Sequence, residues 1–341
     1  MSLKEIAHRA GTSVSTVSRV LNQPDYKCKN PELEARIWAA AQEISYTPNT
    51  AAQTLKSGAP HIKTTPLTFD IFLTRFPSLS QDLFFSELFE SLKKELLRQQ
   101  CVPGKFLTLP EVTSMLKEKS SFSVTDTHAD GIILLGKCPA ELISTLQNHY
   151  HNIVGIDRNP TNFDYDEVIC SGEAAAKMAV ERLITLGHKK IAYIGDCTYE
   201  SRYVGYYQTL LTHHIPFDYR HVHPSSQTEE EGARIMNDIL KEEDPPTAIF
   251  CANDCTALGV LRSLNKCRRK NYLPSVIAID NIRKSAKTSP MLTTIDIPKQ
   301  ELAHFALLLL LDQQKKAHKE CVRIELPCRL IERESCTYAP C

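Results

Sequence analysis

The stretch Ala10–Asn22, AGTSVSTVSRVLN, decides how the beginning of this chain folds. Its apolar residues recur at the spacing of one helix face: Val14, Val17, Val20 and Leu21. The opposite face carries short hydrogen-bonding groups, one guanidinium and no acid: Ser15, Thr16, Ser18, Arg19 and Asn22. A face that meets only water normally carries more Glu and Lys. We therefore expect this one to lie against a polar, anionic partner.

The residues on either side of this stretch supply helix starts and stops. Ser2 and Glu5 fit a capping box, which predicts a first helix, and Gly11 suits the left-handed turn that ends it. Ser13 can cap the second helix. Two short helices joined by a turn that contains glycine describe a helix-turn-helix. Asn30, followed by Pro31, predicts the start of a third helix.

Length and composition limit the classes of protein that the chain can be. Its 341 residues suggest two or three domains, and 40 Lys+Arg balance 40 Asp+Glu, so any nucleic-acid binding must be local. The longest apolar run, Ala306–Leu311, is too short to span a membrane. The 12 cysteines stand in a chain that opens without a signal peptide, so we expect reduced thiols and a cytoplasmic protein. Metal-ligand spacings and nucleotide-binding motifs are missing, and we expect neither metal nor cofactor.

From about residue 67 onward, short apolar runs alternate with helical patterns. The runs cover residues 69–73, 131–135, 152–157, 189–195, 247–253 and 275–280, and the clearest helical stretches cover Leu83–Gln100, Glu173–Leu186 and Glu230–Leu240. This alternation predicts βαβ units and parallel sheets. Ligands of such folds bind beyond the carboxyl ends of strands, which draws attention to the polar residues at 157–159, 253–254 and 280–281.

Two long motifs resemble the amino-terminal signature of the LacI/GalR family of transcriptional repressors: LKEIAHRAGTSVSTVSRVLN (3–22) and YTPNTAAQTLKSG (46–58). Later segments such as VGIDRN, RYVGY and AIFCANDCTALG are similar to landmarks of the same family. The resemblance implies a small all-α helix-turn-helix domain over residues 1–58 that includes a hinge helix at about 49–57. It implies a two-lobed α/β domain over 62–341, like periplasmic binding proteins, with parallel sheets.

The resemblance also implies which residues touch DNA. The second helix of the family reads the major groove, which would place Val14, Ser15 and Arg19 against bases. Arginine can bond guanine through two acceptors, and short hydroxyl side chains can hold phosphates. In the hinge helix Leu55 would be inserted into the minor groove. The full set of expected DNA contacts is Ser13, Val14, Ser15, Thr16, Ser18, Arg19, Asn22, Asn49, Ala52, Leu55 and Lys56.

The effector site follows from the same resemblance. Arg202 matches an arginine that bonds sugar hydroxyls, Asp280 the acid opposite it, and Asn253 an amide of the cleft. Phe84 and Phe85 match ring positions against the ligand, although one of them is expected to be core. We expect Asp254 only to cap its helix.

The chain departs from the family where an aromatic residue often precedes the glycine matched by Gly232. Gln227 stands there instead. The departure predicts a pocket more polar than usual, so the identity of the ligand should not be copied from any relative.

Together these observations predict a homodimeric repressor of sugar-utilisation genes that binds a pseudo-palindromic operator, because two-fold protein symmetry matches such a site. A sugar between the lobes would control DNA binding allosterically. One alternative keeps the DNA binding but makes the effector a purine or a phosphoprotein. A remote alternative is a glycoside hydrolase, which needs two carboxylates about 5–9.5 Å apart and leaves residues 1–58 without a role.

Overall fold

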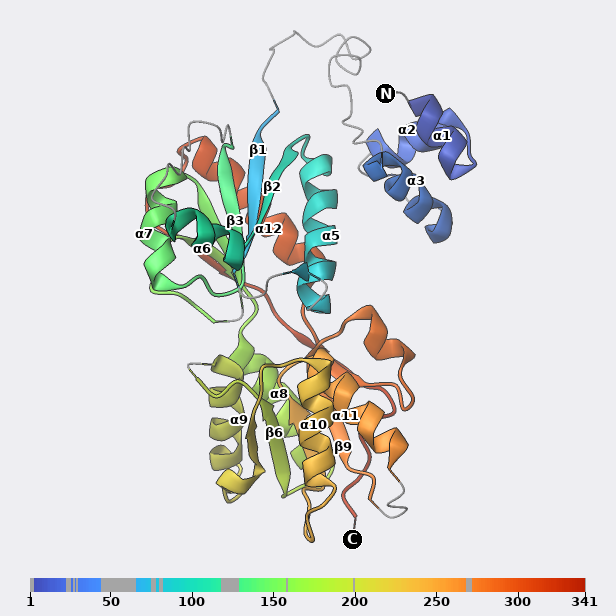
Figure 1. Cartoon of the computed structure of the whole chain (residues 1–341), viewed down its shortest axis with the longest axis vertical. Coiled ribbons are helices and arrows are strands. Elements are labelled where there is room, and N and C mark those ends of the chain that lie inside the picture. Colours follow the sequence, from blue (N-terminus) through green and yellow to red (C-terminus); the bar gives the residue numbers. More distant parts are fainter. Residues whose placement is uncertain are drawn as a thin grey trace.

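A small helical domain is followed by two α/β lobes in the computed structural model of this chain (Figure 1). The structure describes residues 3–22, 26, 28, 30–43, 66–74, 78–79, 82–117, 129–157, 159–198, 200–267 and 272–340. The predicted hinge helix, with Asn49, Ala52, Leu55 and Lys56, lies outside these residues. So does the boundary expected between the two domains at about 58–62.

The N-terminal helices are α1 (Leu3–Ala10), α2 (Val14–Asn22) and α3 (Pro31–Glu43). They enclose a small core in which Ile6, Val17 and Ile37 are fully buried. Burial of apolar surface is what holds helices of this length in place, since a helix of eight or nine residues is marginal in water by itself.

Local signals fix where these helices begin and end. Gly11 has a φ of +63°, the left-handed conformation that glycine adopts without strain. Ser13 Oγ accepts a hydrogen bond from Thr16 N at 3.1 Å, and Asn30 Oδ1 accepts from Glu32 N and Leu33 N at 3.0 and 3.1 Å. The predicted turn and both of these caps are confirmed.

The first lobe is built on a parallel sheet with the strand order β11-β5-β4-β3-β1-β2. Its strands are β1 (Thr68–Leu73), β2 (Val102–Thr108), β3 (Gly131–Leu135), β4 (Ile153–Asp157), β5 (Asp166–Ile169) and β11 (Arg323–Glu325). Its helices are α5 (Leu83–Arg98), α6 (Leu109–Lys117), α7 (Ala140–His149) and α12 (Lys299–Gln314).

The second lobe repeats this plan with the strand order β12-β10-β9-β8-β6-β7, in which β12 alone is paired antiparallel among the described strands. Its strands are β6 (Ile191–Gly195), β7 (Val222–Pro224), β8 (Ala248–Cys251), β9 (Ser275–Asp280), β10 (Thr293–Asp296) and β12 (Arg329–Ile331). Its helices are α8 (Gly172–Thr185), α9 (Ser201–Thr212), α10 (Glu229–Ile239) and α11 (Asp254–Lys266), with short 3₁₀ turns at Tyr219–His221 and Arg283–Lys287.

The chain crosses between the lobes between β5 and α8, between β10 and α12, and between β11 and β12. As a result α12 follows the last long strand of the second lobe but packs on α5 and β4 of the first. The crossing segments run through the waist of the molecule in Figure 1. This connectivity makes the two lobes separate bodies joined by strands, which is the arrangement that the resemblance predicted.

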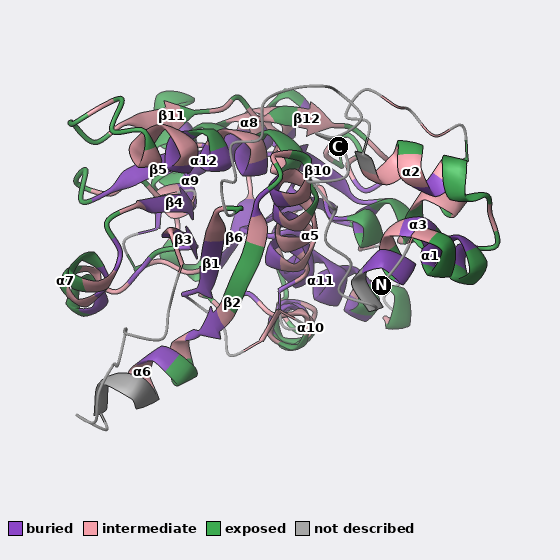
Figure 2. Cartoon of the chain, turned by 90° about the horizontal axis from the view of Figure 1, so that it is seen from above, coloured by how far each residue is buried: buried purple, intermediate pink, exposed green. Residues whose placement is uncertain are grey.

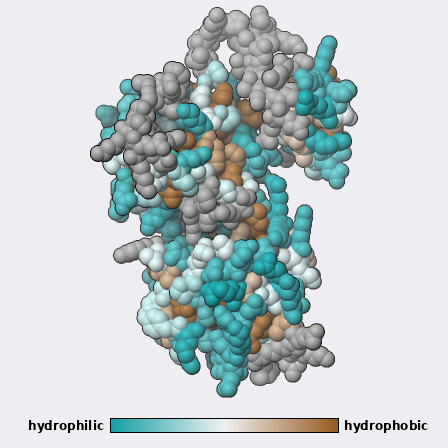
Figure 3. All heavy atoms as spheres, in the orientation of Figure 1, coloured by the Kyte–Doolittle hydropathy of each residue, from teal (hydrophilic) through white to brown (hydrophobic). Residues whose placement is uncertain are grey.

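Burial follows the sheets. The central strands are buried, while the helices carry exposed residues on their outer sides (Figure 2). Side chains on the visible face of the second lobe are largely hydrophilic, with scattered hydrophobic residues (Figure 3). Among the described helices, none is long and apolar enough to cross a membrane.

Candidate functional site: a recognition helix and a cleft between two lobes

The exposed face of α2 carries most of the residues expected to touch DNA. Ser13, Ser15 and Arg19 are exposed, and Val14 is 40% exposed, whereas Val17 is fully buried. Val14, which the resemblance places against bases, is therefore exposed, although its spacing along the helix matches that of the buried Val17. It lies at the first position of the helix, before the turn that packs on α1 and α3, so its side chain is open to a partner.

The hydroxyl groups at the start of α2 form a cluster. Ser13 Oγ lies 2.8 Å from both Ser15 Oγ and Thr16 Oγ1, which holds the three hydroxyls together at the helix N-terminus. The positive end of the helix dipole lies at the same place and favours phosphate. Ser18 is partly exposed one turn further on. Asn22 is the last residue of α2, and its side chain lies outside the described atoms.

Arg19 extends from the exposed side of α2 with its guanidinium 5.8 Å from the centre of the Tyr26 ring. A cation over an aromatic face is held weakly, by about 0.5–1 kcal/mol at an exposed site. This contact limits the orientations of the side chain without consuming its hydrogen-bond donors. Arg19 therefore keeps its donors for guanine or phosphate.

Between the lobes lies a cavity of about 580 Å³. The first lobe contributes residues at or after the ends of β1, β3 and β4, and the second contributes residues that follow β6. The cavity thus lies at the carboxyl ends of parallel strands, where such folds bind ligands. Its described lining includes Thr74, Phe85, Gly136, Lys137, Asp157, Asn159, Thr161, Asp164, Asp196, Thr198, Glu200 and Arg202.

Arg202 lines this cavity but is already bonded within the protein. Its side chain is 1% exposed. Nε and Nη2 donate to the two carboxylate oxygens of Glu200 at 2.8 and 2.9 Å, Nη1 donates to Ala252 O at 2.8 Å, and Nη2 also donates to Gln227 Oε1 at 3.1 Å. Burial alone would lower the pKa of Arg202, but the facing Glu200 carboxylate raises it above its ordinary value. Since a guanidinium has five N–H donors, one remains for a ligand.

Asp280 lies at the end of β9, 1% exposed, with a φ of 125° that is unusual for a residue other than glycine. Its charge is close enough to contribute to the raised pKa of Arg202. Its backbone oxygen accepts a hydrogen bond from Lys299 Nζ at 2.6 Å, which ties the strand end to α12 of the other lobe. The structure therefore brings Asp280 into the neighbourhood of Arg202, but Asp280 is not among the described residues that line the cavity. Strained backbone of this kind gathers at functional sites.

Asn253, and not Asp254 as the sequence suggested, caps α11. Asn253 is the N-cap of α11, and its Oδ1 accepts from Thr256 N at 2.9 Å and from Thr256 Oγ1 at 2.6 Å. Its amide Nδ2 donates to Gln227 O at 3.1 Å. The prediction that Asp254 caps this helix is wrong, because Asn253 has the extended backbone of a cap and Asp254 is the first helical residue. Asn253 shapes the wall behind Arg202 rather than reaching the cavity with a spare group.

The two phenylalanines are both buried, at 3% for Phe84 and 2% for Phe85. Asp82 caps α5 by accepting hydrogen bonds from the backbone N–H groups of both, at 2.8 and 3.3 Å. Phe85 contributes to the cavity lining, while the Phe84 ring lies 5.4 Å from Lys299 Nζ. Both are part of the core cluster, and Phe85 is the one that the cavity reaches.

Several lining residues were not expected individually, above all Thr74, Lys137, Asp196 and Glu200. Their shared signal was available in the sequence, since each of the first three directly follows a predicted strand or its terminal glycine. Glu200 gave no such signal. It is the N-cap of α9, and its pairing with Arg202 depends on how that helix begins.

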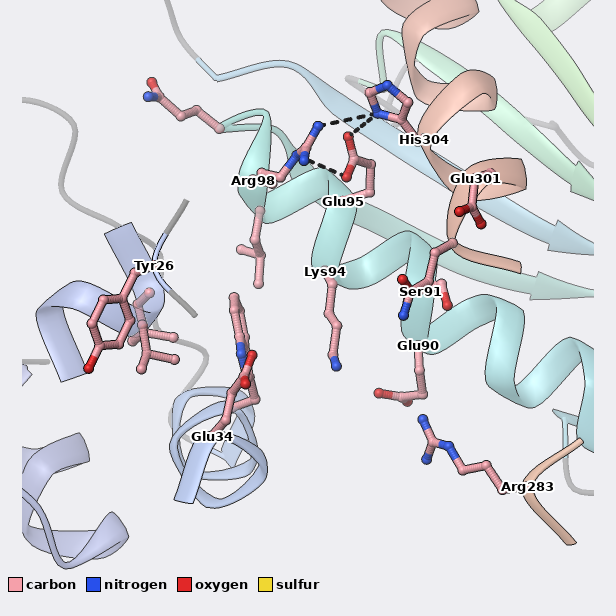
Figure 4. Close-up of a pocket in the computed structure, with 16 residues that line it drawn as sticks. Tyr26, Glu34, Glu90, Ser91, Lys94, Glu95, Arg98, Arg283, Glu301 and His304 are labelled. Atoms are coloured by element: carbon pink, nitrogen blue, oxygen red, sulfur yellow. Dashed lines mark hydrogen bonds and ion pairs between the residues drawn. The ribbon is translucent and has the colours of Figure 1, made fainter. Parts of the chain in front are cut away.

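A second hollow of about 600 Å³ lies between the N-terminal domain and the surface of α5 and α12 (Figure 4). Its wall contains a charged cluster in which Glu95 Oε1 lies 2.8 Å from His304 Nδ1 and Glu95 Oε2 lies 3.1 Å from Arg98 Nε. This hollow is lined by helix surfaces, away from the carboxyl ends of the strands. The cleft between the lobes is therefore the better candidate for an effector.

Two family models match separate parts of the chain. Residues 2–49 match the family described as bacterial regulatory proteins, lacI family, and residues 180–336 match the periplasmic binding protein-like domain. The chain is 29% identical over 349 residues to the HTH-type transcriptional repressor PurR of Klebsiella pneumoniae subsp. pneumoniae, across 99% of this chain and 98% of that protein.

Solved structures share the fold over nearly the whole chain. A complex of the transcriptional regulator CelR with cellobiose has a TM-score of 0.70 at 22% identity, and covers 98% of this chain and 99% of its own. The lac repressor dimer bound to operator and the anti-inducer ONPF has a TM-score of 0.65 at 23% identity, with 99% of each chain covered.

Proposed function

We propose that this chain is a DNA-binding transcriptional repressor of the LacI family, and that it binds a pseudo-palindromic operator as a homodimer under the control of a small molecule held between its lobes. The observation that carries the proposal is that one protein contains both a cleft at the strand ends and an exposed recognition helix without acidic residues. A dimer is supported by the small size of one such domain, which makes few contacts alone, and by a structural neighbour that binds operator as a dimer.

Replacing Arg19 with alanine should weaken binding to specific operator by about 1–3 kcal/mol and relax the preference at one base pair in each half-site. The reason is that its guanidinium can bond two acceptors of a guanine, and nothing in α2 replaces them. Fluorescence anisotropy on an operator obtained by in vitro selection, and on single-base variants of it, measures both effects.

Arg36→Ala is the matched control, since it removes the same charge from an exposed position on α3. Equal weakening of Arg19→Ala on every DNA sequence would make Arg19 a phosphate contact and contradict base reading.

Leu55→Ser should lower specific affinity and DNA bending together. The expected hinge segment is too short to persist as a helix by itself, and Leu55 is its one large apolar side chain. An apolar wedge unstacks a base step and kinks the duplex. Gel shifts on circularly permuted DNA measure the bend, and an unchanged bend in the variant would refute the wedge.

For the effector we propose a sugar. Its support is the polar lining, in which threonine and asparagine side chains accompany a single described aromatic ring, Phe85. Gln227 stands where an aromatic residue would offer a flat face, and it bonds Arg202 instead. A purine is the second candidate, favoured by the relatives named PurR. No feature of the described residues favours a phosphoprotein as the effector. The matched relatives are regulators, which gives no support to the alternative of a glycoside hydrolase.

A thermal-shift screen of sugars and purine bases against the full-length protein tests the effector proposal. A compound that raises the melting temperature should also change the affinity for operator DNA in a titration, because binding between the lobes alters their orientation. Stabilisation by purines without any sugar would overturn the sugar proposal. Stabilisation that never alters operator binding would overturn the control of DNA binding by this cleft.

A further inference from the structure

We propose that the effector is a polyhydroxylated molecule that carries a protonated amino group, held between carboxylates contributed by both lobes. This inference rests on the proposed function, because it takes the cleft between the lobes as the effector site. It concerns the chemical class of the ligand, which the fold does not specify.

The first observation is the charge of the described lining. It contains four carboxylates, those of Asp157, Asp164, Asp196 and Glu200, against two cations, Lys137 and Arg202. The described side chains therefore give the cavity a net charge of −2. A cavity with low-dielectric walls concentrates such a field, and a cation entering it is attracted more strongly than it would be at an open surface.

The second observation is that Arg202 offers a ligand one N–H donor but no uncompensated charge. Four of its five N–H donors are engaged, and the two oxygens of Glu200 neutralise its charge inside the wall. A phosphate or carboxylate on the ligand would have to displace Glu200, which is itself 4% exposed, or face the remaining carboxylates. Breaking a buried ion pair in that way is strongly unfavourable. We therefore expect phosphorylated sugars not to bind.

The third observation is how the carboxylates are divided between the lobes. Asp157 ends β4 and Asp164 precedes β5 in the first lobe, while Asp196 follows β6 in the second. Like charges on facing walls oppose closure of the cleft, and an ammonium group between them removes that repulsion. The charge on the ligand would thus act on the orientation of the lobes and not on affinity alone.

The hydroxyl groups of the ligand have partners in the same lining. Asn162 and Thr198 both belong to this lining, and both are exposed. A side-chain amide and a hydroxyl group each donate and accept hydrogen bonds, so these side chains suit a ligand whose hydroxyl groups do the same.

The test uses the full-length protein and three matched sets of compounds: glucose, galactose and mannose, their 2-amino derivatives and their 6-phosphates. Thermal shifts rank the compounds, and isothermal titration calorimetry gives the dissociation constant of each one that binds. At least one 2-amino sugar should bind about tenfold more tightly than its neutral parent, the difference expected from one added charge-assisted hydrogen bond. No 6-phosphate should bind.

Asp157→Asn and Asp196→Asn provide the second arm. Each is isosteric and should abolish the preference for the amino sugar over its parent, while Asp238→Asn, an exposed aspartate of α10 outside the described lining, should leave it unchanged. Equal or tighter binding of neutral or phosphorylated sugars would overturn this inference but leave the cleft as the effector site. A panel in which no amino sugar binds overturns it as well. Operator affinity, measured separately, reports whether the proposed function itself fails.

Discussion

Replacing Arg202 with alanine is expected to lower the free energy of unfolding of the second lobe by about 3–5 kcal/mol, because it leaves the Glu200 carboxylate buried without its partner. Arg202 is 1% exposed and Glu200 is 4% exposed, so neither charge is compensated by water. Gln227 Oε1 and Ala252 O lose hydrogen bonds at the same time. Urea denaturation followed by tyrosine fluorescence and circular dichroism measures the loss.

The double variant Glu200→Gln, Arg202→Met is the matched comparison. It removes both charges while keeping most of the volume, and it should recover a large part of the lost stability, as buried ion pairs replaced together often do. A loss below about 1 kcal/mol in Arg202→Ala would mean that water reaches Glu200, and would contradict the buried pair.

The single variant Arg202→Ala should also abolish the response of operator affinity to effector. Affinity for operator without effector should stay near that of the wild type, since Arg202 belongs to the second lobe and the recognition helix to a separate domain. Loss of DNA binding in the absence of effector would make Arg202 a purely structural residue for the whole chain.

Most of the architecture could be predicted because it depends on local patterns. The six apolar runs correspond to β1, β3, β4, β6, β8 and β9, which are buried on both faces and therefore read as continuous apolar stretches. The strand β2 was missed because Val102–Lys105 is mostly exposed and its register shifts between Phe69 and Ile71 of β1. The strands β7, β11 and β12 have three residues each, too few for a periodic signal.

The residues of the candidate site could be predicted where they follow directly from the order of strands along the chain, but their pairing could not. Polar residues at strand ends were expected to line the cleft, and Asp157 and Asn159 do so. The pairing of Arg202 with Glu200 could not be foreseen, because it needs the N-cap geometry of α9, where Glu200 also accepts from Arg202 N at 3.3 Å. The consequence for function is large, since an arginine predicted to bind ligand is mostly occupied inside the protein.

Asp254→Asn is expected to stabilise the second lobe by at least about 2 kcal/mol more at pH 8 than at pH 5. Asp254 is fully buried, and burial, together with the charge of Asp280, raises the pKa of its carboxyl to about 8. The folded protein therefore holds a proton that the unfolded chain releases near its ordinary pKa of about 3.9. Stability contributed by that proton is complete below the unfolded pKa and is lost as the pH rises through the folded pKa. Asparagine cannot ionise, so the variant escapes this loss.

The hydrogen bonds of Asp254 allow the substitution. Its Oδ2 accepts from Ile282 N at 2.9 Å and its Oδ1 accepts from Thr294 Oγ1 at 2.6 Å. In the variant the amide oxygen can keep the Ile282 N–H, and the Thr294 hydroxyl can rotate to accept from the amide nitrogen. Urea denaturation at intervals from pH 5 to pH 8 measures the difference from wild type, and Asp244→Asn is the control. The pKa of that exposed aspartate is lowered by Lys190, so its contribution should be flat over this interval. A pH-independent effect of Asp254→Asn would mean that Asp254 is ionised in the folded protein. The buried carboxylates of Asp254 and Asp280 would then both be charged and would need Lys299 to stabilise them.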